Sequence, residues 1–82
     1  MMMADKLEPR IIIDPFSLLV VNSRGELKRI YCPFLARCMI PVNNLLVNEA
    51  YVIDMVKTDL SEEIIFIIQG KPFLHSFFNI LP

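Results

Sequence analysis

The sequence predicts an all-β domain, a small antiparallel barrel of five or six strands with an N-terminal β-hairpin extension. Three observations predict this fold. The chain has 82 residues, which is enough for one domain. Hydrophobic residues make up 55% of it and charged residues 21%, so it has ample apolar surface to bury. The apolar residues lie in short segments rich in Ile, Val, Phe and Tyr, separated by turn-forming residues, which is typical of small barrels and sandwiches.

The start of the chain differs from the rest. Its first ten residues are mostly polar, contain Pro9 and lack apolar periodicity. We therefore expect residues 1–10 to form a flexible N-terminal arm and residues 11–82 to form a single domain.

The clearest local pattern is a hairpin. Ser17–Val21 reads as a strand, and Gly25 in the following turn supplies the positive φ that a hairpin needs. Glu26–Tyr31 alternates apolar and polar residues and forms the returning strand. Pro33 ends that strand, because proline cannot donate to a central ladder.

The second half of the chain contains further strand segments. Strict alternation along the long segment Ala50–Thr58 would place Val52 and Val56 on the same face. Residues 44–50 stay open between helix and loop, and Ser76–Ile80 stays open between a helical turn and a last strand. The expected segments are Ala36–Ile40, Ala50–Thr58, Glu63–Gln69 and Pro72–His75.

From Ala36 to Phe78 the order is a strand (ARCMIPV), a polar loop ending in LLVNEAYVIDMV, a hairpin to EEIIFIIQGKPF and a closing HSFFNIL. This order resembles that of small bacterial and phage SH3-like barrels, in which a G-x-x-Y-x-V entry follows the loop and an F-x-I segment closes the chain. Asn48 stands where the entry usually has glycine, and asparagine tolerates the left-handed conformation. The resemblance implies a binding module, and no catalytic residue carries over from it.

The chain contains two cysteines, Cys32 and Cys38. We expect two reduced, partly buried thiols, although their spacing leaves a bridge between them open. Together with His75 they lack the close cysteine pairs of a structural zinc site. We therefore expect no metal, no cofactor and no enzymatic activity. Because neither an export signal nor an apolar run of about 20 residues is present, we expect a cytoplasmic protein that does not enter membranes.

The hydrophobic content exceeds the about 45–50% of typical soluble domains, and a chain this short cannot bury all of it. We therefore expect an exposed apolar patch that binds a second copy or another protein. The predicted function is a non-catalytic protein-interaction or assembly module that self-associates. The candidate partner surface consists of four side chains near the ends of the domain: Phe16, Leu19, Phe73 and Phe77.

A nucleic-acid-binding accessory protein is the alternative. Cations and two aromatic rings alternate between Arg24 and Arg37, as in proteins that bind single strands. A net charge of −1 argues against this role, since nucleic-acid-binding domains are usually basic. The candidate nucleic-acid surface consists of Arg24, Lys28, Arg29 and Arg37.

Overall fold

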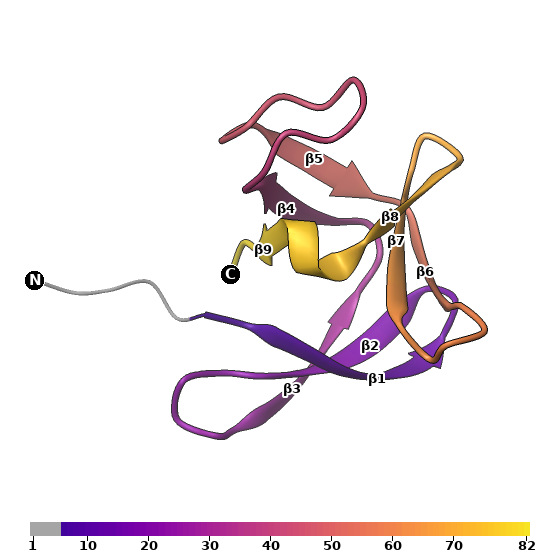
Figure 1. The fold of residues 1–82 in the computed structure, drawn as a ribbon. Coiled ribbons are helices and arrows are strands. Elements are labelled where there is room, and N and C mark those ends of the chain that lie inside the picture. The colour runs from indigo at the N-terminus through magenta and orange to yellow at the C-terminus, as the bar shows by residue number, and fades with distance from the viewer. Residues whose placement is uncertain (1–5) are drawn as a thin grey trace, which may run out of the picture.

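The computed structural model describes residues 6–82, and its regular elements are β-strands apart from one short 3₁₀ turn. The strands form three antiparallel, three-stranded sheets in the orders β1-β2-β3, β5-β4-β9 and β6-β7-β8 (Figure 1). These ladders do not join into one closed barrel. The elements are β1 (Glu8–Asp14), β2 (Ser17–Val21), β3 (Leu27–Tyr31), β4 (Phe34–Cys38), β5 (Ala50–Ile53), β6 (Met55–Thr58), β7 (Ile64–Ile68), β8 (Lys71–Leu74), η1 (His75–Phe77) and β9 (Phe78–Ile80).

The hairpin expected at the start of the domain is confirmed. Strands β2 and β3 pair without irregularity from Ser17 opposite Tyr31 to Val21 opposite Leu27. Gly25 has a φ of 80°, a left-handed conformation that costs glycine little. The turn therefore forms where the sequence placed it.

Strand β1 corrects the extent of the expected arm. Residues 1–5 lie outside the described part of the chain, but β1 begins at Glu8 and pairs with β2. Leu7 is buried, and Ile12 packs against the core, so this segment contributes apolar side chains to the domain. Pro9 is tolerated because β1 is an edge strand and its register shifts between Pro9 and Ile11.

The prediction of one long strand over Ala50–Thr58 is wrong in one respect, because the strand is broken at Asp54 into β5 and β6. The N–H of Asp54 donates to the carbonyl of Ile67, and its carboxylate accepts from the N–H of Gln69. The chain leaves the sheet of β4 at this point and joins the sheet of β7. The break shifts the alternation by one residue, so Ile53 and Val56 are both buried.

The two open assignments are settled. Residues 44–50 contain no helix: residues 44–49 belong to a loop over residues 39–49, and Ala50 begins β5. Two hydrogen bonds join this loop to the strands that flank it. The N–H of Asn48 donates to the carbonyl of Cys38 in β4, and the N–H of Leu46 donates to the hydroxyl of Tyr51 in β5. The segment Ser76–Ile80 contains both of the expected alternatives, because the 3₁₀ turn η1 is followed directly by strand β9.

One hydrophobic core lies between the three sheets. Phe66 of β7 is fully buried at its centre, and its ring meets Phe34 of β4 at 5.4 Å and Phe78 of β9 at 5.9 Å between centroids. Strand β2 adds its inner face to the same cluster. The other side chains fully buried in it include Leu18, Val20, Ala36, Cys38 and Ile53.

Candidate functional site

The structure does not bring the four residues of the candidate partner surface together. Phe16 is exposed at the turn between β1 and β2, and Leu19 is half-buried on the outside of β2. Phe73 is buried, because β8 turns it into the core against Phe78, 6.2 Å away between ring centroids. Phe77 in η1 is half-buried and packs against the same core. The C-terminal half of the expected surface is thus largely used for folding.

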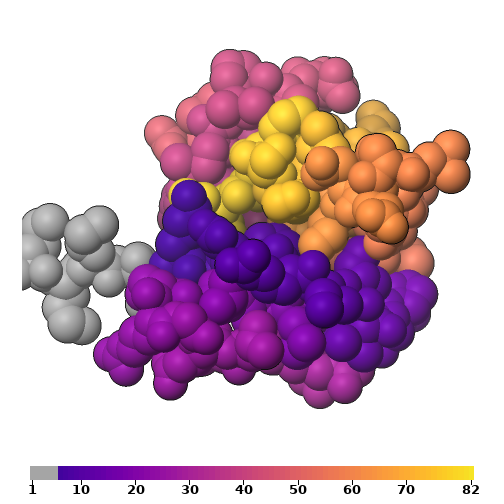
Figure 2. Space-filling view, turned by 60° about the horizontal axis from the view of Figure 1, so that its bottom comes forward, coloured from indigo at the N-terminus to yellow at the C-terminus, as the bar shows by residue number. Residues whose placement is uncertain are grey.

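An apolar surface exists instead on one face of the β1-β2-β3 sheet. Strand pairing aligns Ile11, Leu19 and Arg29 on this side, while the opposite side carries Leu18 and enters the core. Figure 2 shows the segment containing these strands, coloured indigo to magenta, across the lower half of the molecule. We call this the outer face and define it by Ile11, Leu19, Val21, Leu27, Arg29 and Tyr31.

Most of the outer face is accessible. The side chains of Leu27, Tyr31 and Ile11 are 64%, 63% and 59% exposed, and Leu19 and Val21 between them are half-buried. Exposed large apolar side chains are normal when scattered, but a contiguous group marks a contact surface. Here strand register makes them neighbours on three adjacent strands.

Arg29 lies on the outer face in the edge strand β3, beside Leu19 of the central strand, and its charge is balanced within the chain. Its guanidinium donates to Ser17 Oγ at 2.9 Å and to Asp14 Oδ2 at 3.2 Å, and it lies 5.1 Å from the centroid of the Tyr31 ring. A hydrogen bond from the N–H of Phe16, with help from Ser17 and Arg29, lowers the pKa of the Asp14 carboxyl. The outer face therefore carries an oriented ion pair beside an aromatic ring, with both charges already partnered.

The edges of this sheet discourage pairing with another strand. Strand β1 is irregular, with register shifts on both sides of Ile11 and Ile12. Strand β3 is regular but places the cations Lys28 and Arg29 at its middle. Irregularities and charges are the usual protections of edge strands. The face, rather than either edge, is therefore the open surface of the sheet.

The four cations of the candidate nucleic-acid surface do not share one face: three lie on the β2–β3 hairpin and one in another sheet. Arg24 lies in the β2–β3 turn, and Lys28 and Arg29 are successive residues that point to opposite sides of β3. Arg37 lies in a different sheet, where its guanidinium donates to the carbonyl of Asn48 at 2.6 Å. Two of the four therefore already have partners in the fold, and no single basic face results.

The cysteines are both free thiols. Burial raises the pKa of the Cys32 thiol, and the buried Cys38 donates its S–H to the carbonyl of Ile40 at 3.0 Å. The Nε2 of His75 lies 3.9 Å from a carboxylate oxygen of Glu63, and neither cysteine takes part in this contact. Within residues 6–82 no three potential metal ligands come together, and no helix in that range is long and apolar enough to cross a membrane.

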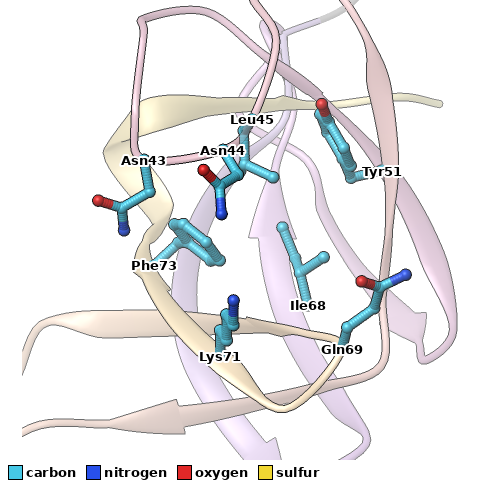
Figure 3. A pocket seen from close by; sticks show the side chains of 8 residues that line it. All are labelled: Asn43, Asn44, Leu45, Tyr51, Ile68, Gln69, Lys71 and Phe73. Atoms are coloured by element: carbon cyan, nitrogen blue, oxygen red, sulfur yellow. The ribbon is translucent and has the colours of Figure 1, made fainter.

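A second surface feature was not predicted from the sequence. A pocket of about 460 Å³ lies where the loop over residues 39–49 meets the tight turn between β7 and β8 (Figure 3). The sequence marks both turns, at Asn43-Asn44 and at Gly70, but no local pattern indicates that they come together. The pocket therefore depends on tertiary structure alone.

Comparison of the chain with family models, with curated proteins and with solved structures gives no match.

Proposed function

We propose that this chain is a non-catalytic interaction module that self-associates through the outer face of its β1-β2-β3 sheet. The observation that carries the proposal is the contiguous group of exposed apolar side chains beside the Arg29–Asp14 ion pair. Burying such side chains is favourable by roughly 25 cal/mol per Å² of apolar surface. Because Arg29 and Asp14 already pair with one another, covering them does not leave either of these charges unpaired.

A second copy fits this face better than a charged partner does. The apolar side chains of the face lie beside a balanced ion pair, with Glu8 opposite Val21 at one end, so the apolar part complements itself when two copies meet about a two-fold axis. The contact would be small, since three strands of about five residues cover only roughly 15 by 15 Å. Standard interfaces bury about 800 Å² per partner, so we expect a weak dimer that dissociates on dilution.

We also propose that the segment from Ala36 to Phe78 belongs to a variant of the SH3-like barrel. Its support is the order of elements from β4 to β9: a strand, a long loop, the interrupted strand β5 and β6, the hairpin-linked β7 and β8, and a terminal strand. Asn48 has a φ of 71°, the left-handed conformation for which the related barrels would use glycine. A cytoplasmic location for the module agrees with its two free thiols.

Sedimentation velocity over protein concentrations from about 1 µM to about 1 mM tests self-association. We expect the weight-average mass to rise above 9.5 kDa with concentration. Leu27→Asp should prevent this rise, because it places a charge on the outer face. Leu60→Asp is the matched control, since Leu60 is also exposed but lies in the turn between β6 and β7.

Far-UV circular dichroism of both variants verifies that the β structure is retained. A monomer at every concentration would contradict self-association. The same mass profile for Leu27→Asp and Leu60→Asp would show that association uses some surface other than the outer face.

A further inference from the structure

We propose that the pocket between the 39–49 loop and the β7–β8 turn binds a small carboxylate that carries an apolar group. The pocket is separate from the outer face, so this inference does not depend on self-association. It lies between two segments that are about 25 residues apart in sequence, and its lining combines hydrogen-bond donors, one cation and a buried apolar floor.

The polar side of the pocket favours an anion. Figure 3 shows the ammonium of Lys71 and the amide of Asn44 pointing toward one another across the opening, with Gln69 at the rim. Lys71 can only donate hydrogen bonds, and the two amides can donate as well as accept. No carboxylate is among the described residues that line the pocket. A ligand carboxylate between Lys71 and Asn44 would therefore find donors on both sides.

One acid that contacts the turn is outside the lining and already has a partner. The Asp54 carboxylate accepts from the backbone N–H of Gln69 at 3.1 Å. It thus helps to hold the turn in place, although its charge offsets part of the attraction of Lys71. We therefore expect the cation to contribute modestly, as charges at exposed sites do.

The floor of the pocket favours an apolar group. Phe73 and Ile68 are buried, and both lie between the polar groups and the core. Leu45 closes the loop side, and Tyr51 forms a wall that is fixed by the hydrogen bond its hydroxyl accepts from the N–H of Leu46. A volume of about 460 Å³ is within the range of small-molecule pockets. A ring or short aliphatic chain next to the carboxylate would cover this floor.

The turn that carries Gln69 is conformationally unfavourable for that residue. Gln69 and Gly70 have φ of 50° and 78°, and they are the two central residues of a tight hairpin turn. Glycine and asparagine are the residues preferred there. Gln69→Gly should therefore keep or raise the stability of the fold while it removes an amide from the rim, and this separates binding from folding.

Amide NMR titration of the full chain with phenylacetate tests the proposal, with the isosteric phenylacetamide as the uncharged comparison. We expect shift changes at Asn44, Gln69 and Gly70 and a dissociation constant of about 1 mM, as is usual for so small a ligand. Phenylacetamide should bind at least about threefold more weakly, because it lacks the charge that Lys71 attracts.

Variants assign the site. Lys71→Met should weaken phenylacetate binding about three- to fivefold. Lys57→Met is the matched control, since Lys57 is exposed in the same sheet but does not line the pocket, and it should leave the constant unchanged. Gln69→Gly should weaken binding without lowering the urea midpoint. Equal affinity for the amide, unchanged binding in Lys71→Met, or shifts confined to other parts of the chain would overturn the proposal.

Discussion

Asn22 organises the turn between β2 and β3. It is one of two buried polar residues among residues 6–82, and its Oδ1 accepts from the N–H groups of both Arg24 and Glu26 at 2.9 Å. Its amide also donates to the Glu26 carboxylate. A single side chain thus satisfies two backbone donors that the turn leaves without a ladder partner.

We predict that Asn22→Ala lowers the free energy of unfolding by about 1–3 kcal/mol, because both backbone donors lose their acceptor. Urea unfolding followed by circular dichroism measures this change. Glu26→Gln is the control, since its amide oxygen can still accept from Asn22, and it should change the value by no more than about 0.5 kcal/mol. Equal stability of Asn22→Ala and the parent would show that water satisfies these donors as well.

Sequence patterns predict a residue's conformation better than its exposure. The left-handed φ of Gly25 and of Asn48 follows from local turn chemistry, and both agree with the expectation. The exposure of Phe73 was predicted incorrectly, since it depends on which face of β8 meets Phe78 and Phe66, residues that the fold places there. The outer face was found only in part, through Leu19, because its other members are spread over three strands.

Strands follow from the apolar segments, but their breaks do not. The expected strand Ala50–Thr58 has no glycine or proline to mark an interruption. The break at Asp54 arises because β5 must pair with β4 while β6 must pair with β7, in a different sheet. The pairing partners β4 and β7 lie before and after this segment in the sequence, so the apolar periodicity within Ala50–Thr58 cannot reveal the break.

A matched pair of substitutions tests this break. Val52 and Val56 would share a face in an unbroken strand, but they are 47% and 1% exposed in the structure. A Val→Thr substitution keeps the shape of the side chain and replaces one methyl group with a hydroxyl. We predict that Val56→Thr costs about 1–3 kcal/mol of unfolding free energy, because it buries that hydroxyl. Val52→Thr should stay within about 0.5 kcal/mol of the parent, and urea unfolding of the two variants compares them. Similar losses in both would contradict the break.

At the scale of the whole molecule, the all-β class was predictable and the division into three sheets was not. Short apolar segments and turns indicate strands, yet they do not say that β4 pairs with β9 across more than half of the domain. The chain changes sheets between β3 and β4, at Asp54 and through η1, and each change interrupts a ladder that a closed barrel would continue. The pocket has the same origin, since distant turns meet there.

The three sheets share one core, which has a consequence for unfolding. The inner face of the β1-β2-β3 sheet buries Leu18 and Val20 in the same cluster as Phe66 of β7. The N–H of Val56 in β6 also donates to the carbonyl of Pro15, between β1 and β2, at 2.8 Å. A three-stranded sheet needs its apolar face covered in order to be stable. The sheets should therefore unfold together.

The two tyrosines allow this cooperativity to be measured, because the chain has no tryptophan and each tyrosine reports on a different sheet. Tyr51→Phe leaves Tyr31 in β3 as the fluorophore, and Tyr31→Phe leaves Tyr51 in β5. We predict that, within each variant, tyrosine fluorescence and far-UV circular dichroism give the same urea midpoint. Adding Phe66→Leu, in β7, should lower the midpoint seen by Tyr31 as much as that seen by Tyr51, since both sheets lose contacts to one core. A Tyr31 transition that does not respond to Phe66→Leu would show that the N-terminal sheet folds independently of the rest of the domain.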